Sequence, residues 1–223
     1  MNNLVSAYCQ GIGVPAFSLF DAAFNAGLRT TAVGSEALTC FRPEGIVYTG
    51  FRHFPRFDLD LSGATVLYLV RDPRDMLVSL YHSTVSSHAI PERHREMQRA
   101  RTRAQQQTID QFVLNNTKNL MDSFRQYQER LIDEATVIYR YEDVIYDKAA
   151  WLGDMLSRLE LKLDRSLLNR VASRFDIFPK VEIASEHIRQ VTPGDHQIKL
   201  KPDTIHALNS RLGDFMASYG YAS

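Results

Sequence analysis

The stretch Thr65–Val70 (TVLYLV), followed at once by Arg71–His82 (RDPRDMLVSLYH), decides the class of fold. Its first six residues favour β-structure and include no charged residue, which is typical of a strand covered on both faces. A helix is predicted directly after it, because Asp72 is a good N-cap, Pro73 suits the first helical position and Asp75 adds acid to the first turn. A strand that runs straight into a helix is typical of sheets wrapped by helices.

The same alternation of strands and helices continues along the chain. Two more strands are predicted, at residues 45–51 and 136–141. Apolar residues at helical spacing predict helices at 17–26, 109–131, 148–159 and 203–219. No linker or repeat divides the chain, so we expect one α/β domain over residues 1–223, with a central parallel sheet between layers of helices.

Composition and charge argue against several classes of protein. The 223 residues carry 26 basic and 26 acidic side chains, so general attraction to nucleic acid or an anionic membrane is not expected. Cys9 and Cys40 are too few for a disulfide framework and fit a reducing compartment. There is no signal-peptide pattern, no apolar run long enough for a transmembrane segment and no metal-binding motif. We expect a cytoplasmic protein that needs no metal.

A candidate anion site lies where the strand gives way to the helix. Ligands of parallel sheets bind beyond the carboxyl ends of the strands, where Arg71 stands beside the free N–H groups of a helix start. Helical spacing puts Ser79 on the polar face with Asp75, within reach of a phosphate, and Leu80 on the face toward the sheet. The simpler alternative is that Asp72 and Asp75 only cap the helix and Arg71 only pairs with a carboxylate.

The segment Y-L-V-R-D-P-R-D-M-L-V-S-L-Y-H closely resembles the one by which sulfotransferases hold the 3′-phosphate of their donor, 3′-phosphoadenosine 5′-phosphosulfate (PAPS). In that family the arginine that opens the motif and the serine eight residues later contact this phosphate, which implies the same roles for Arg71 and Ser79. The resemblance also implies a P-loop-NTPase-like fold with three α/β/α layers, PAPS as co-substrate and no metal.

A late loop strengthens the resemblance. Arg189–His196 (RQVTPGDH) resembles the family's R-K-G-x-x-G-D-W loop, which implies that Arg189 contacts the 3′-phosphate and that Gly194 belongs to the donor site. Gln190 replaces the family's lysine, so we expect weaker binding of the donor than is usual. His196 replaces its tryptophan.

Two shorter matches supply the remaining site residues. The segment V-I-Y-R-Y-E-D-V resembles the family's strand ending in Tyr-Glu-Asp, whose tyrosine lies near the adenine. The matching residue is Tyr141. Tyr141 could equally be a buried aromatic residue of the strand. The family places a histidine base in K-T-H-x-P, and H-x-P recurs here with His53, although Arg52 replaces the threonine. His82 and His88 are weaker candidates for the base.

The family's first strand and its P-K-S-G-T-T-W loop, which wraps the 5′-phosphosulfate, have no counterpart here, and residues 2–10 resemble the helix that follows that loop. We therefore expect a domain that is N-terminally incomplete relative to the family. One hypothesis is a sulfotransferase that moves a sulfuryl group in line to an acceptor hydroxyl or amine. The other is a catalytically impaired nucleotide-binding or interaction module. A sheet without its first strand could also pair with a second copy of the chain.

The acceptor is not readable from the sequence, and small-molecule, lipid and carbohydrate acceptors all remain open. Five arginines cluster at Arg93, Arg95, Arg99, Arg101 and Arg103. This cluster is interpreted as a solvated helix or loop, with a polyanion contact or a lid over the acceptor site as alternatives; nucleic acid is not an expected partner.

Overall fold

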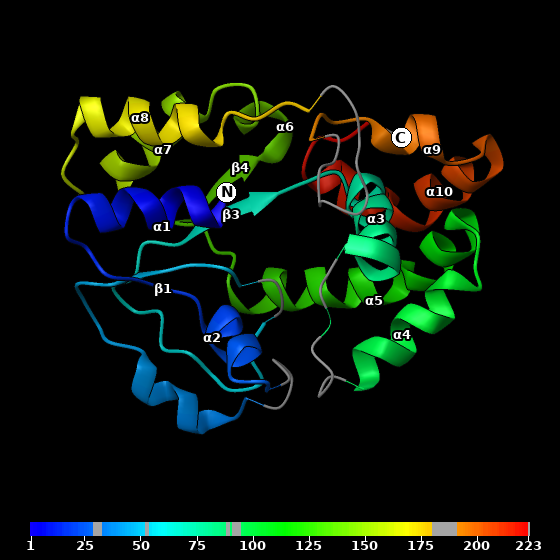
Figure 1. Ribbon diagram of the computed structural model, residues 1–223, viewed down its shortest axis with the longest axis horizontal. Coiled ribbons are helices and arrows are strands. Elements are labelled where there is room, and N and C mark those ends of the chain that lie inside the picture. Colours follow the sequence, from blue (N-terminus) through cyan, green and yellow to red (C-terminus); the bar gives the residue numbers. More distant parts are fainter. Residues whose placement is uncertain (29–32, 52–53, 88–89, 91–94, 180–190, 223) are drawn as a thin grey trace. The chain divides into compact units, whose positions relative to one another are not determined.

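The chain forms two compact units, each assembled from segments that are distant in sequence. Figure 1 labels helices and strands of both units. The computed structural model describes residues 1–28, 33–51, 54–87, 90, 95–179 and 191–222. Unit 1 comprises Met1–Leu67, Leu131–Val137 and Asp147–Ile177. Unit 2 comprises Tyr68–Arg130, Ile138–Tyr146 and Phe178–Ser223. That residues 1–223 act as a single domain stays a prediction.

Unit 1 combines a short parallel sheet with helices. Its elements are α1 (Asn2–Gly11), β1 (Ala16–Phe17), α2 (Leu19–Asn25), the 3₁₀ helix η2 (Ser35–Cys40), β2 (Val47–Tyr48), α7 (Lys148–Arg158) and α8 (Arg165–Phe175). β1 and β2 pair in parallel, with Ala16 opposite Val47. α1 packs against α8, and the fully buried Tyr8 joins them because its hydroxyl donates to the Lys162 carbonyl at 3.0 Å and accepts from the Asp164 amide at 2.8 Å.

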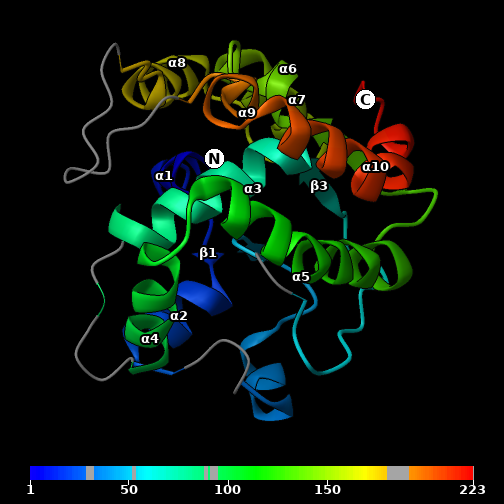
Figure 2. The same cartoon turned by 90° about the vertical axis from the view of Figure 1, so that its right-hand side faces the viewer.

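Unit 2 carries the strand–helix stretch from Tyr68 to His82, and the first residue of each of its two strands, Leu67 and Val137, belongs to unit 1. The elements of unit 2 are β3 (Leu67–Val70), α3 (Pro73–His82), the π-helical turn η3 (Ser83–Ser87), α4 (Arg95–Gln105), α5 (Ile109–Arg130), β4 (Val137–Arg140), α6 (Tyr141–Val144), α9 (Asp195–Lys199) and α10 (Pro202–Ser218). β3 pairs with β4. α3 packs against α5, α9 and α10, and α5 also packs against α10 (Figure 2). Leu77, Val113 and Leu208 are fully buried among these helices.

The observed elements follow the predicted alternation, with corrections at their ends. The predicted strand at 45–51 is reduced to β2, and the one at 136–141 ends at Arg140 because Tyr141 already opens α6. The helix predicted at 17–26 begins at Leu19, since Phe17 belongs to β1 and the Ser18 hydroxyl caps the helix by accepting from the Asp21 amide at 3.2 Å.

The described part of the arginine cluster is helical. Arg95, Arg99 and Arg103 lie on the exposed side of α4, whereas Arg101 donates from Nε to the Thr84 carbonyl of η3 at 3.0 Å. This placement agrees with a solvated helix, and neither a polyanion contact nor a lid is tested by it. Among the described residues, no helix is both long and apolar enough to cross a membrane.

Candidate functional site

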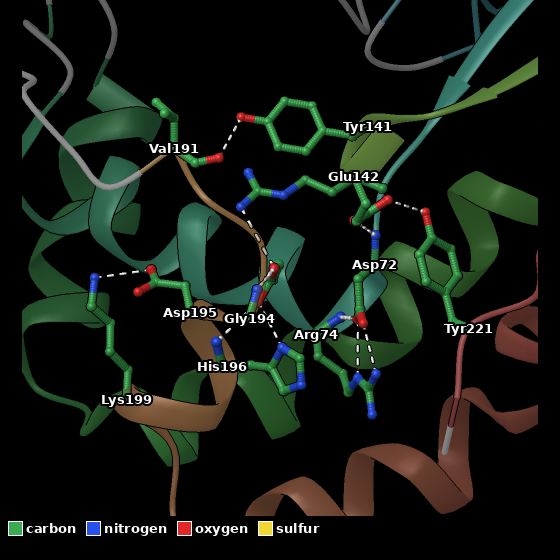
Figure 3. A network of polar contacts seen from close by, with 12 residues as sticks. Asp72, Arg74, Tyr141, Glu142, Val191, Gly194, Asp195, His196, Lys199 and Tyr221 are labelled. Atoms are coloured by element: carbon green, nitrogen blue, oxygen red, sulfur yellow. Dashed lines mark hydrogen bonds and ion pairs between the residues drawn. The ribbon is translucent and has the colours of Figure 1, made fainter. Parts of the chain in front are cut away.

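The turn from β3 to α3 is the centre of the candidate site (Figure 3). β3 ends at Val70 and α3 begins at Pro73, so Arg71 and Asp72 form the connection. Asp72 caps the helix, because its Oδ1 accepts from the backbone amide of Arg74 at 2.9 Å. The helix start predicted from the sequence is therefore confirmed.

Arg74, the second arginine of the motif, joins several segments of unit 2 through hydrogen bonds. Arg74 is buried, and its Nε and Nη2 donate to the two carboxylate oxygens of Asp72 at 3.0 and 2.7 Å. Nη1 donates to Asn209 at 2.8 Å, and Nη2 also donates to the Ala222 carbonyl at 3.0 Å. A guanidinium engaged in this way has little left to offer a ligand.

Arg71, in contrast, has a guanidinium donor without a hydrogen-bond partner among the described residues. Its side chain is 20% exposed, and Nη2 lies 3.8 Å from Asp75 Oδ2, too far for a hydrogen bond. The guanidinium carbon stands 4.6 Å from the centre of the Tyr141 ring. Nε is buried and has no hydrogen-bond partner among the described residues. A buried donor without a partner is costly, so the surroundings of Arg71 fit an anionic group that would accept from it.

Asp75 anchors the loop that precedes α9. The carboxylate is 1% exposed and accepts from the Gly194 amide at 2.8 Å and from the His196 amide at 2.9 Å. His196 Nδ1 lies 2.6 Å from the same oxygen as its own amide. The polar face of α3 that carries Asp75 is covered by the loop, and the prediction that Leu80 faces the sheet was wrong, because Leu80 is 41% exposed.

This network keeps Asp75 ionised. Burial alone would raise the pKa of its carboxyl group, but the hydrogen bonds from His196 and Gly194 and the charge of Arg71 outweigh it and lower the pKa below the ordinary value of 3.8. A carboxylate next to Arg71 holds the guanidinium in place without a hydrogen bond that would occupy its donors.

Gly194 and Tyr141 fix the loop at two further points. Gly194 has a φ of +92°, a left-handed conformation that glycine adopts without strain, and it forms the N-cap of α9. The Tyr141 hydroxyl donates to the Val191 carbonyl at 2.8 Å. Burial raises the pKa of Tyr141, against the opposing charge of Arg71, so the hydroxyl stays a donor. Tyr141 thus links the loop to the arginine that rests on its ring.

Glu142 and Tyr221 complete the network on the other side of the turn. Glu142 Oε1 accepts from the backbone amide of Asp72 at 2.9 Å, and its Oε2 accepts from the Tyr221 hydroxyl at 2.8 Å (Figure 3). No role was predicted from the sequence for either residue. Glu142 stands in the Tyr-Glu-Asp match.

The structure brings together Arg71, Tyr141 and Gly194 of the predicted site residues, and all three lie in unit 2. Ser79 lies half-buried on α3, two turns beyond the start of the helix. His53 and Arg189, together with the weaker candidate His88, lie outside the described residues. The roles inferred for the site residues remain predictions.

His82 is half-buried at the end of α3, with its ring 5.3 Å from that of Tyr81. In the part of the chain that the structure describes, no group of three His, Cys, Asp or Glu side chains is placed to hold a metal ion.

Comparisons with known proteins identify the kind of fold. A family model described as the sulfotransferase domain matches residues 57–197. Retinol dehydratase in complex with androsterone and the inactive cofactor PAP has a TM-score of 0.58 and 18% identity, over 88% of this chain and 60% of that one. Mouse sulfotransferase SULT7A1 complexed with PAP has a TM-score of 0.61 and 13% identity, over 96% of this chain and 80% of that one.

This chain thus spans about 60% of the length of retinol dehydratase. A search of curated proteins found no matching sequence. The matches confirm the predicted α/β fold of the P-loop-NTPase-like kind.

Proposed function

Because the chain belongs to the sulfotransferase family, we propose that it binds PAPS and transfers the sulfuryl group to an acceptor hydroxyl or amine. The observation that carries this proposal is the contrast between the two arginines of the motif. Arg74 is committed to Asp72, Asn209 and Ala222, whereas Arg71 keeps a buried Nε without a partner among the described residues. A phosphate oxygen would satisfy that donor.

The donor's 3′-phosphate is assigned to the turn between β3 and α3. Arg71 would hold it by charge-assisted hydrogen bonds, Ser79 would donate its hydroxyl, and Arg189 would add a second guanidinium. Tyr141 would lie by the adenine while its hydroxyl keeps the loop in place through Val191. These contacts would fix the donor so that its sulfur faces the acceptor.

Transfer exchanges one S–O bond for another with no change in oxidation state. As the acceptor oxygen attacks the sulfur, His53 takes its proton, and the bond from sulfur to the 5′-phosphate breaks to leave PAP, adenosine 3′,5′-bisphosphate. A neutral imidazole suits this task at neutral pH. Retinol dehydratase was solved with androsterone and with retinol, which supports a small-molecule alcohol as the first class of acceptor to test.

Replacing His53 with alanine is expected to lower turnover by about 10²- to 10⁴-fold, because general-base catalysis contributes on that scale. The dissociation constant for PAP should stay unchanged, since the base acts on the acceptor. Transfer of labelled sulfuryl group from PAPS to steroid, retinoid, phenol, lipid and sugar hydroxyls measures turnover, and His206→Ala, an exposed histidine on α10, is the matched control.

Retained turnover in His53→Ala would contradict the role of His53 as the general base. Wild-type protein that binds PAP but transfers to no acceptor would instead support a nucleotide-binding module. Protein that neither binds nor transfers would contradict the proposed function as a whole.

A further inference from the structure

We propose that Glu142 and Tyr221 are positioning residues for the donor: they hold the turn that carries Arg71 in the orientation that binds the 3′-phosphate. This inference rests on the proposed function and assigns two residues that do not touch the ligand. All the contacts involved lie within unit 2.

The Asp72 amide at the start of α3 takes its acceptor from outside the helix. In a capping box, the carboxylate three residues into the helix accepts from the N–H of the N-cap residue. The matching carboxylate here is Asp75, but both of its oxygens accept from the loop residues Gly194 and His196. Glu142 takes over the missing role, with Oε1 2.9 Å from the Asp72 amide nitrogen.

That amide belongs to the peptide bond between Arg71 and Asp72. Since a peptide unit is planar, a hydrogen bond to its N–H fixes the plane that directly follows the Arg71 Cα. The direction in which the Arg71 side chain leaves the turn is therefore set partly by Glu142.

Glu142 is itself held by Tyr221. Its Oε2 accepts from the Tyr221 hydroxyl at 2.8 Å. Burial, followed by the bond to Glu142 and its charge, raises the pKa of Tyr221, so its hydroxyl remains a donor at physiological pH. This hydrogen bond thus occupies Oε2, the Glu142 oxygen that does not accept from Asp72.

Two arginines hold the segment that presents Tyr221. The Arg140 guanidinium carbon stands 4.6 Å from the centre of the Tyr221 ring, and its Nη1 donates to the Gly220 carbonyl at 3.2 Å. Arg74 donates to the Ala222 carbonyl at 3.0 Å. The Tyr221 ring is buried, so the tyrosine is a fixed support.

Glu142 also acts through its charge. Glu142 directly follows Tyr141, whose ring supports the Arg71 guanidinium. The charge of Glu142 acts on Tyr141, so a Glu142 oxygen that loses the Tyr221 hydroxyl as its donor would compete with the phosphate for Arg71. Tyr221 therefore acts both on the geometry of the turn and on the availability of its arginine.

Tyr221→Phe tests the inference with the smallest change, since the ring and its contact with Arg140 are kept. We expect about tenfold weaker binding of PAP in calorimetry, as for the loss of a hydrogen bond to a charged group. Binding of adenosine 5′-monophosphate, which lacks the 3′-phosphate, should change much less. Tyr146→Phe, an exposed tyrosine of the same unit, is the control and should bind PAP as the wild type does.

A second pair of variants separates positioning from folding. Glu142→Gln keeps an oxygen for the Asp72 amide and should bind PAP more tightly than Glu142→Ala does. In the ligand-free protein, hydrogen exchange of the Asp72 amide should be faster in Tyr221→Phe than in the wild type, whereas amides of α5 should exchange at unchanged rates.

Three outcomes would overturn the inference. Tyr221→Phe could bind PAP as tightly as the wild type, which would leave the proposed function intact. It could weaken PAP and adenosine 5′-monophosphate equally, which would place the effect away from the 3′-phosphate. Absence of PAP binding in folded wild-type protein would remove the proposed function, and this inference with it.

Discussion

Arg71→Ala is expected to weaken PAP binding by about 100-fold or more, while the free energy of unfolding changes little. Two charge-assisted hydrogen bonds to a phosphate contribute about 3 kcal/mol together, and each 1.4 kcal/mol is tenfold in affinity. Little stability should be lost, because the Arg71 guanidinium makes a 3.8 Å ion pair and a ring contact but no hydrogen bond from Nε. Calorimetry with PAP and denaturant unfolding measure the two effects.

Arg74→Ala is the matched control within the same motif. Its guanidinium makes four hydrogen bonds to Asp72, Asn209 and Ala222, so its loss should lower the stability of the protein. Arg71→Lys should recover part of the affinity for PAP, because a lysine keeps the charge but cannot form bidentate hydrogen bonds to a phosphate. Unchanged PAP affinity in folded Arg71→Ala would contradict the assignment of the phosphate to this turn.

Asp75→Asn is expected to reduce the free energy of unfolding by about 3 kcal/mol at pH 7, because hydrogen bonds to a buried charged group contribute about 1.5–3 kcal/mol each. The carboxylate accepts from Gly194 and His196, and an amide would place an N–H opposite their donors. PAP affinity should fall as well, since the loop from Val191 to His196 is held on α3 through this residue. Urea unfolding at pH 7 measures the change.

The stability difference between wild type and Asp75→Asn should depend on pH through the pKa of Asp75. The pKa of Asp75 is lower in the folded protein than the ordinary 3.8, so its contribution is present above that value and is lost as the pH falls through it toward the folded pKa. The difference in stability between wild type and Asp75→Asn should therefore be steady from about pH 5 to 8 and shrink below about pH 4. Asp122→Asn, at an exposed carboxylate, should change stability little. A difference that grows toward acid pH would contradict the prediction.

Local patterns in the sequence were sufficient for three of the longer helices, whereas α8, which is as long as α7, was not predicted. α5, α7 and α10 begin and end within one residue of the predicted bounds, because each carries a sustained apolar face. The strands predicted at 45–51 and 65–70 were too long, because β2 and β3 leave their flanking residues outside the strands, and β1 was not predicted. Phe17 was assigned to a helix for its spacing, although the Ser18 cap excludes it.

The contacts that shape the candidate site could not be predicted in the same way. Asp75 meets His196 across 121 residues of sequence, and Glu142 meets Asp72 across 70. Periodicity indicates which residues share a face of α3, but it does not indicate which face a distant loop covers. Asp75 lies on the polar face as predicted, but its cover by the loop was not foreseen, and Leu80, predicted to face the sheet, is 41% exposed.

The most direct test of the central claim is a comparison of two ligands by calorimetry on the wild-type chain. PAP and adenosine 5′-monophosphate differ by the 3′-phosphate alone, the group assigned to Arg71 and its surroundings. Micromolar binding of PAP, at least about 100-fold tighter than that of adenosine 5′-monophosphate, is the predicted result. Equal affinities, or no binding of PAP by demonstrably folded protein, would contradict it.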